Sequence, residues 1–384
     1  MRKTFKYRIY PSKSQEISLN EQLETCRKLY NKLLSDRKDS WENSQVSISM
    51  YDQHKVITEL KKTWLNLKDV HSQVLQDIAT RIDLAFKSFF RRVKTGEKAG
   101  YPRFKSFSRY DSLTYKQYGN GVKIIDDSLK GKVNLSKIGH IKTIFHRKVE
   151  GVIKNVIITK SSTGKWYISF SCEADQKILP KSNLNVGVDV GLETFAYMSD
   201  NTKIDNPRFF RTEENQLAKA NRKLASFPKP TKNHPSTIER LKAKKVLSRV
   251  HERIKFKREN FIHQESRKII NKYQIIAIED LNINRMVHNH CLAKSILDAS
   301  WSLFSSVLNF KAEEAGRLIV KVNPAYTSQD CSKCGHREKK SLSTRQHNCK
   351  CCGLSINRDL NASINILRIG LDSLGIQSLE AHEF

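Results

Sequence analysis

The sequence predicts a multidomain α+β protein, in which a small β-barrel is interrupted by a helical bundle and an α/β domain is interrupted by a four-cysteine module. Three observations support this prediction. The chain has 384 residues, which is too many for one ordinary compact domain. Its hydrophobic periodicity changes from helical to strand-like, and then to alternating strands and helices. Five of its eight cysteines lie within residues 331–352.

The first half of the chain has the pattern of a sheet with a helical insertion. Residues 5–10 alternate as a strand does, and Pro11 ends that pattern. Helical periodicity then recurs over residues 12–41, 51–63 and 72–93. From residue 112 to 174 the pattern returns to short alternating strands with Gly-containing turns between them. We therefore expect the first strand to join the later strands in one barrel.

The second half alternates strands and helices in the order that is typical of a ribonuclease H-like α/β domain. Strands are predicted at residues 184–190, 194–200, 273–281 and 317–324. Helices are predicted at residues 213–226, 236–272, 295–316 and 357–374. The cysteine cluster interrupts this domain before its last helix.

These patterns divide the chain into five expected parts. They are a β-barrel of residues 1–10 and 96–178, an inserted helical bundle of residues 11–95, a ribonuclease H-like domain of residues 184–325 and 354–372, a cysteine-rich module of residues 326–353, and a flexible tail of residues 373–384.

The charge of the chain points to a polyanionic partner. Lys+Arg 69 against Asp+Glu 39 gives a formal net charge of +30, and a chain this basic favours nucleic acid. A membrane is the weaker choice, because no stretch approaches the roughly 18 apolar residues of a spanning helix. The N-terminus has no apolar core of a secretory signal, so we expect a cytoplasmic protein. A generally basic surface, as in a ribosomal protein, is the alternative.

Three carboxylates fall where metal chemistry would require them. Asp189 lies in a strand among valines, Glu279 ends an apolar strand, and Asp359 opens the last helix. Hydrolysis of a phosphodiester needs an activated water and a neutralised leaving oxygen, and two Mg²⁺ ions held by carboxylates supply both. Asp280 is a rival to Glu279. Neighbouring residues of a strand face opposite sides, so only one of the two can point into the site.

Two C-x-x-C motifs predict a structural zinc site. Cys331, Cys334, Cys349 and Cys352 offer four thiolates, and each pair can reach one tetrahedral ion. A closed site of four thiolates leaves no open position for catalysis, so the ion would stabilise the fold. Cys351 could replace Cys352, and His336 or His347 could replace a thiolate.

Several motifs, in this order along the chain, resemble those of the TnpB family, the transposon-encoded proteins related to type V CRISPR effector nucleases. They are FKYRIYPSKSQ, CRKLYNKLL, AFKSFFRR, GYPRFKS, KWYISFSCE, GVDVGLETFAYMSD, IAIEDLN, NPAYTSQDCSKCG and CKCCGLSINRDLNASINIL. The resemblance covers nearly the whole chain. It departs from the family at Asn357, where the family often has Asp before the Arg of its last motif.

The resemblance implies an RNA-guided DNA endonuclease with a RuvC-type nuclease domain. A guide RNA would pair with double-stranded target DNA beside a short flanking motif. By position, Asp189, Glu279 and Asp359 match the catalytic acids that bind Mg²⁺ or Mn²⁺. Cys331, Cys334, Cys349 and Cys352 match the zinc ligands. The family also implies a bacterial cytoplasmic protein.

The residues that contact nucleic acid are expected in the helical bundle and the basic loop after it. The candidates are Tyr51, Lys55, Ser72, Gln73, Gln76, Arg91, Arg92, Arg103 and Lys105. Glutamine can bind adenine edges, and the cations can bind phosphates. The alternatives to a guided nuclease are a non-cleaving regulator of transposition and a strand-transferring transposase. Such transposases usually end their acid set in Glu, whereas this chain ends in Asp359.

Overall fold

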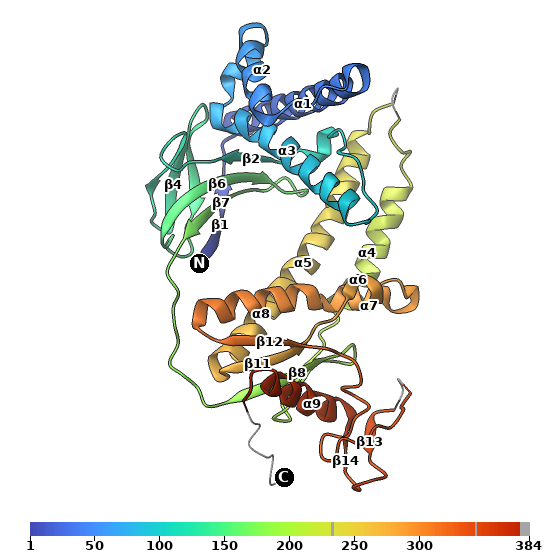
Figure 1. Cartoon of the computed structure of the whole chain (residues 1–384). Helices are drawn as coiled ribbons and strands as arrows, with labels where there is room; N and C mark the ends of the chain where they lie inside the picture. The colour runs from blue at the N-terminus through green and yellow to red at the C-terminus, as the bar shows by residue number, and fades with distance from the viewer. Residues whose placement is uncertain (232–233, 342–343, 377–384) are drawn as a thin grey trace. The chain divides into compact units, whose positions relative to one another are not determined.

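The computed structural model describes residues 1–231, 234–341 and 344–376. The chain folds as two compact units, of which the first is Met1–Ala174 and the second begins at Asp175. Each unit has its own sheet and its own buried core (Figure 1). In the described part of the chain, no helix is both long enough and apolar enough to cross a membrane.

The first unit contains a seven-stranded antiparallel half-barrel sheet in the order β2-β6-β7-β1-β5-β4-β3. Its strands are β1 (Arg2–Tyr10), β2 (Ser112–Tyr115), β3 (Val122–Asp126), β4 (Lys130–Leu135), β5 (Gly139–Ile144), β6 (Val152–Lys160) and β7 (Trp166–Glu173). As the sequence predicted, β1 joins the later strands, because it pairs with β5 and β7.

Three α-helices lie between β1 and β2: α1 (Lys13–Ser44), α2 (Met50–Thr63) and α3 (Ser72–Lys94). Ser12 and Gln15 form a capping box that starts α1, and Ser49 and Asp52 form one that starts α2. The apolar face of α1 is buried at the predicted spacing, by Leu19, Leu23, Cys26, Tyr30, Leu33 and Leu34. The helices and the sheet share one hydrophobic core.

The second unit has a five-stranded sheet in the order β10-β9-β8-β11-β12. Its strands are β8 (Asn185–Val190), β9 (Thr194–Met198), β10 (Lys203–Asp205), β11 (Ile275–Glu279) and β12 (Leu318–Val322). Strands β8, β11 and β12 are parallel, and β9 and β10 complete the sheet as antiparallel strands.

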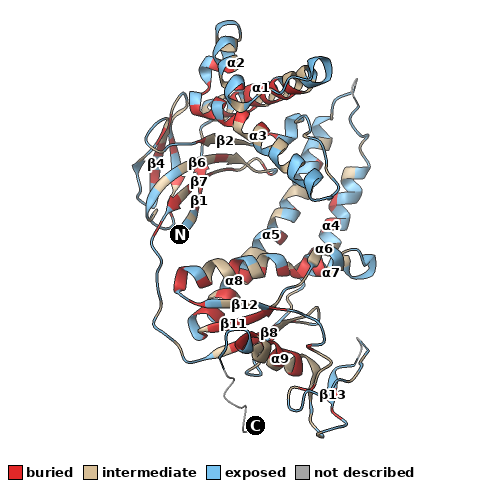
Figure 2. Cartoon of the chain, in the orientation of Figure 1, coloured by how far each residue is buried: buried red, intermediate tan, exposed pale blue. Residues whose placement is uncertain are grey.

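Helices cover both faces of this second sheet (Figure 1). The helices of this unit are α4 (Phe209–Ala225), α5 (Ile238–Lys272), α6 (Ile283–Met286), α7 (His290–Ala299), α8 (Trp301–Ala315) and α9 (Arg358–Asp372). Of these, α4 packs against α5 in a small core of its own. Helices α5 and α8 pack on the face that carries Val188 and Ile278. Helix α9 packs on the opposite face, where Ile366 meets Ala277. Figure 2 shows that β8 and β11 are largely buried and that α9 is buried or half-buried, whereas much of α5 is exposed.

The prediction of a single helix over residues 295–316 is wrong. The structure has two helices there, because Ser300 adopts a left-handed conformation with φ 57° and ends α7 before α8 begins. Helical periodicity continues through this break, so the pattern could not reveal it. Of the expected flexible tail, residues 377–384 lie outside the described residues, and residues 373–376 form the turn after α9.

Candidate active site and cysteine cluster

The register of two parallel strands places Asp189 beside Glu279. Ala277 pairs with Gly187 and Ile278 pairs with Val188, so the next step along both strands brings the two acids together. Gly187 and Ala277 face α9, and side chains alternate along a strand, so both acids also face α9. They lie at the carboxyl ends of strands whose connections leave in opposite directions, where open α/β sheets commonly bind ligands.

Helix α9 brings the third acid to the same place. A Cβ added at Gly187 would overlap the Ser363 carbonyl oxygen, and one added at Gly370 would lie 2.6 Å from the Ala277 Cβ. These two glycines therefore let α9 approach the sheet closely. Asp359 lies in the first turn of α9.

Asn357 is the N-cap of α9 and fixes the start of the helix. Its side-chain oxygen accepts the backbone N–H of Asp359 at 2.8 Å and that of Leu360 at 3.3 Å. Asn and Asp are about equally good at this position. The departure from the family pattern that the sequence showed at Asn357 therefore preserves the cap.

The three carboxylates interact electrostatically. All are partly accessible to solvent. Burial raises the pKa of Asp189 well above its usual value, the charges of Glu279 and Asp359 raise it further, and Arg358 opposes them. Burial also raises the pKa of Glu279, although a hydrogen bond from the Thr327 hydroxyl, at 2.7 Å, works against this rise. The structure thus gathers the three predicted acids around one place.

Asp280 has a different environment from Glu279. It is exposed, and its carboxylate pairs with the Lys321 ammonium at 3.0 Å. Of the two acids, Glu279 is therefore the one that lies beside Asp189 and faces α9. Beside the acids, Arg345 pairs with Glu193 at 2.5 Å and lies 4.0 Å from the Asp359 carboxylate.

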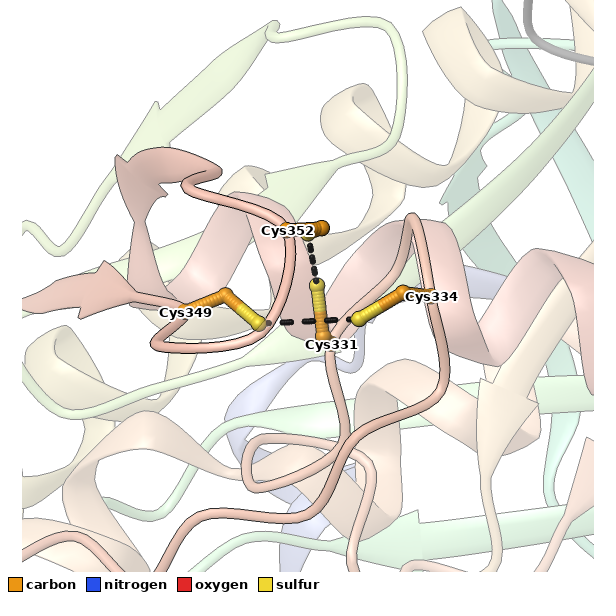
Figure 3. Close-up of side chains that lie close together, drawn as sticks. All are labelled: Cys331, Cys334, Cys349 and Cys352. Atoms are coloured by element: carbon orange, nitrogen blue, oxygen red, sulfur yellow. Dashed lines mark hydrogen bonds between the residues drawn. The ribbon is translucent and has the colours of Figure 1, made fainter.

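The four predicted cysteines meet in one cluster (Figure 3). The sulfur atoms of Cys331 and Cys352 are 3.6 Å apart, those of Cys334 and Cys349 are 3.5 Å apart, and all four lie within 4.8 Å of one another. A tetrahedral ion with Zn–S bonds of about 2.3 Å separates its ligands by about 3.8 Å. The cluster therefore has the dimensions of a tetrathiolate metal site.

Local backbone geometry helps to position the sulfur atoms of the cluster. Gly335 and Gly353 directly follow the two C-x-x-C turns with φ of 74° and 72°, a conformation that favours glycine. Backbone N–H groups of Cys352 and Cys351 point to the Cys349 sulfur and lower its pKa to about 6, although burial opposes them. The Cys351 side chain is exposed and outside the cluster. His336, which is exposed, and His347, which is buried, are also outside it. The set with Cys352 is therefore the one that the structure assembles.

Sequence reasoning missed the residues that join the cysteine module to the acids. Asn361 donates to the Asp330 carbonyl at 2.8 Å and accepts the Ser332 backbone N–H at 2.9 Å. Asn365 donates to the carbonyls of Thr327 and Asp330 at 2.9 and 2.7 Å. Both asparagines are buried on α9. They hold the loop whose Thr327 contacts Glu279, and the only sequence signal was an amide-rich motif, NASIN, in an amphipathic helix.

Most of the expected nucleic-acid contacts lie on the surface of the first unit. The exposed ones are Tyr51, Lys55, Ser72, Gln76, Arg91, Arg92 and Arg103. Lys105 is half-buried, with its ammonium over the Tyr30 ring. Gln73 differs, because it is 8% exposed and its amide exchanges hydrogen bonds with Gln117 at 3.0 and 3.1 Å. Its side chain therefore joins α3 to the chain that follows β2.

Sequence profiles of three families match the chain. They are described as "Helix-turn-helix domain" over residues 1–45, "Probable transposase" over residues 169–290 and "Cas12f1-like, TNB domain" over residues 301–366. Within residues 1–45, the structure has one strand and one long helix, β1 and α1.

The chain is also similar to two curated proteins and one solved structure. It is 32% identical to the "Putative RNA-guided DNA endonuclease" of Streptomyces pristinaespiralis, covering 97% of this chain and 90% of that protein. It is 30% identical to the "Putative RNA-guided DNA endonuclease InsQ" of Escherichia coli K12, covering 95% and 92%. The structure of the mini-RNA-guided endonuclease CRISPR-Cas_phi3 has the same fold, with a TM-score of 0.58 and 12% identity over 97% of this chain and 92% of that one. The chain belongs to the TnpB family.

Proposed function

We propose that this protein is a transposon-associated, RNA-guided DNA endonuclease that cuts double-stranded DNA beside a short flanking motif. Membership of a family whose members are named RNA-guided DNA endonucleases supports this function. The single observation that carries the chemistry is the convergence of Asp189, Glu279 and Asp359 at one edge of the sheet.

The second sheet fits a RuvC-type, ribonuclease H-like nuclease. Asp189, Glu279 and Asp359 would hold Mg²⁺ or Mn²⁺, because such hard cations prefer carboxylate oxygens. Metal ions in such sites activate the attacking water and neutralise the leaving oxygen of a phosphodiester. The protein's own part is to position the acids. Strand register aligns two of them, α9 carries the third, and the Thr327 hydroxyl orients Glu279.

The cysteine cluster would hold one structural Zn²⁺. Its four sulfur donors match the ion's preference for thiolates, and two glycine turns support the chelate. Because α9 contacts both the cluster's loop and the sheet, zinc would also stabilise the position of Glu279.

The remaining parts of the chain are assigned by proposal. Residues 1–10 and 96–178 would form a wedge-like barrel, residues 11–95 a recognition bundle, residues 184–325 and 354–372 the nuclease domain, and residues 326–353 the zinc-binding module.

The net charge of +30 suits a guide RNA and target DNA, whose pairing supplies sequence specificity. Exposed aromatic rings, among them Tyr51, Phe104 and Phe107, accompany the candidate cations of the first unit and could stack on bases. We also propose a bacterial cytoplasmic location.

The proposal is tested with protein that is purified together with its RNA. The RNA is sequenced, and the complex is incubated with Mg²⁺ and plasmids that carry the matching target beside randomised flanking bases. We expect cutting of a subset of plasmids that share one flanking motif. Asp189→Ala should bind the RNA as the parent does and cut nothing. A parent complex that binds RNA and target without cutting would instead indicate a non-cleaving regulator.

A further inference from the structure

The apolar stripe of α3 continues past the hydrophobic core. The core buries one face of the helix as far as Ile82. The same face goes on through Phe86 and Phe89, which are half-buried, to Phe90 and Val93, which are 60% and 55% exposed. Figure 2 shows this change from buried to exposed along α3. The last turns of the helix therefore present an apolar face to solvent.

Four aromatic side chains on and beside this face form a ring cluster: Phe86, Phe89, Phe90 and Tyr101. The rings of Phe86 and Phe90 are stacked, with their centroids 6.2 Å apart. The chain turns after α3 at Gly96, whose φ of 69° favours glycine, and the Tyr101 ring then lies 5.5 Å from the rings of Phe86 and Phe89. Phe86 packs on the core of the first unit and anchors the cluster. Phe90 and Tyr101 are its exposed rings.

Cations without ion-pair partners accompany the ring cluster along the chain. Between Phe86 and Lys105 the only acidic residue is Glu97. Lys87 pairs with the Asp83 carboxylate at 2.9 Å. Five other exposed cations make no ion pair with any carboxylate of the described residues: Arg91, Arg92, Lys94, Lys98 and Arg103. Their uncompensated charge favours an anionic partner beside the rings.

Exposed rings next to unpaired cations suit a ligand that has both flat apolar faces and phosphates, which is a single strand of nucleic acid. The bases of a duplex already stack on one another, so a duplex would use the cations and leave the rings uncovered. RNA is recognised mainly at single-stranded loops and ends, whose bases stack on aromatic side chains. An apolar surface of this kind usually belongs to an interface. A guide RNA stays on the protein before and after DNA arrives, so it can keep the rings covered, whereas a DNA strand would cover them only briefly.

We propose that the ring cluster and its neighbouring cations bind unpaired bases of the guide RNA. The inference rests on the proposed RNA-guided function and names one surface that holds the RNA. Phe90 and Tyr101 would stack on bases, while Phe86 supports them from the core. The cations would neutralise the phosphates on either side. The stacking part of the affinity should resist salt, and the phosphate part should weaken with it.

The experiment measures binding of the co-purified RNA to the whole chain after that RNA has been removed in high salt. Affinities are compared for the parent, Phe90→Ala, Phe90→Tyr and Leu84→Ala, at several salt concentrations and without DNA. Phe90→Tyr keeps a ring at this position. Leu84→Ala is the matched control, because Leu84 is 57% exposed on the same helix and is not part of the ring cluster.

We expect Phe90→Ala to bind the RNA roughly tenfold more weakly, the scale of one lost base stack. The salt dependence of its affinity should equal that of the parent, because a ring releases no counterions. Arg91→Gln should instead reduce the slope of log affinity against log salt by about one. Phe90→Tyr and Leu84→Ala should bind as the parent does. Parental affinity of Phe90→Ala, or an equal loss in Leu84→Ala, would overturn the inference.

A second series separates stacking on a base from an indirect effect on the fold. Single abasic residues replace each nucleotide of the RNA in turn. One abasic position should weaken binding to the parent about tenfold and leave binding to Phe90→Ala unchanged, because that contact is already lost. If the two effects add at every position, the ring touches no base and the inference fails.

Target DNA distinguishes the guide RNA from the other possible strand. A loss in Phe90→Ala that appears only when matching DNA is added to the RNA-loaded protein would assign the ring cluster to a displaced DNA strand, and would also overturn the inference. Cutting by the parent is measured separately. A parent that binds its RNA through Phe90 and cuts no matching DNA would overturn the nuclease function and leave the RNA surface supported.

Discussion

Asp189 carries its negative charge where its surroundings oppose that charge. Burial raises its pKa, and the neighbouring carboxylates of Glu279 and Asp359 raise it further. A protein rarely keeps such an arrangement without compensation, because buried like charges are costly. Bound divalent cations would reverse this balance and turn the mutual repulsion of the three acids into shared attraction.

Asp189→Asn tests separately how the clustered acids affect stability and whether they are needed for cleavage. Without Mg²⁺, the substitution removes one of three repelling charges, so the free energy of unfolding of the second unit should rise. Its melting midpoint should then rise as well. Cleavage with Mg²⁺ should be lost. Calorimetry in magnesium-free buffer and a plasmid cleavage assay check the two effects, and a variant that melts lower than the parent would contradict the repulsion.

That Asp189, Glu279 and Asp359 lie close together could be expected from the sequence, because a carboxylate in or beside an apolar strand is costly unless a cation compensates its charge. The roles of Thr327, Asn361 and Asn365 could not be expected, since they depend on partners that only the fold brings near them. A buried asparagine in an amphipathic helix has no distinctive sequence pattern. Its role follows from the loop carbonyls that it contacts.

At the scale of elements, the site depends on how closely α9 approaches β8. Gly187 has no Cβ, and an added one would overlap backbone atoms of Ser363 and Leu367 in α9. Backbone atoms cannot move aside as the end of a flexible side chain can. The position of Asp359 relative to Asp189 is therefore set by a glycine two residues before the acid.

Gly187→Ala should displace α9 and with it Asp359. We expect a loss of about 1–3 kcal/mol in unfolding free energy, the usual cost of overpacking, and a cleavage rate at least tenfold lower. Urea denaturation and plasmid cutting measure these effects. Gly100→Ala is the control, because an added Cβ there meets no atom within 4 Å. Wild-type cutting by Gly187→Ala would show that the close approach is not required.

Asp200 joins the end of α5 to the β9–β10 turn. Its carboxylate accepts hydrogen bonds from Lys272, at 2.7 Å, and from the Tyr273 hydroxyl. Burial alone would raise its pKa, but these bonds and those from Thr202 outweigh that effect and lower the pKa to about 2. A lowered carboxyl pKa contributes stability above the unfolded-state value, and this stability is lost as the pH falls towards 2.

Asp200→Asn should therefore destabilise the second unit at pH 7 by about 1 kcal/mol, after allowance for solvent screening of a partly exposed pair. The difference between the parent and the variant should shrink as the pH falls from about 4 towards 2, because the parent carboxylate then becomes protonated. Urea unfolding at several pH values checks this prediction. A difference that is constant over that range would mean that the charge of Asp200 contributes nothing.

The helices and strands themselves were largely predictable, because in a long amphipathic segment such as α1 the spacing of the apolar residues indicates both the helix and its buried face. The division between α7 and α8 was not, because the left-handed conformation of Ser300 interrupts the helix without interrupting its apolar spacing. The pairing of β8 with β11 was also beyond the pattern, since 84 residues separate Val190 from Ile275. Register, and with it the meeting of Asp189 and Glu279, is a property of the assembled sheet.

At the scale of the whole molecule, each unit has its own hydrophobic core, and the chain has a formal net charge of +30. Sequence composition predicted the polyanionic partner because repulsion among so many cations is relieved when phosphates neutralise them. Composition alone could not show which unit contains the three acids and the cysteine cluster. The acids and the cysteine cluster both belong to the second unit, so the stability of that unit and its activity should change together.

Removal of the metal from the cysteine cluster tests this coupling. A zinc chelator, or Cys349→Ser, should lower the melting temperature of the second unit, because a structural zinc site contributes folding free energy directly. The first unit has its own core and should melt as before, so calorimetry should resolve two transitions. Cleavage should fall about 10- to 100-fold, the scale that outer-shell support of a metal site commonly contributes, because the loop that carries Thr327 would no longer hold Glu279 in place.

Cys351→Ser is the matched control for this last prediction. It changes an exposed cysteine that is two residues from Cys349 and outside the cluster. It should therefore keep the zinc content, the melting profile and the cutting rate of the parent. If Cys349→Ser behaves in the same way as Cys351→Ser, the cluster does not stabilise the unit. If Cys349→Ser loses zinc and melts early but cuts at the parental rate, the contact between Thr327 and Glu279 does not transmit the effect of the cluster to the acids.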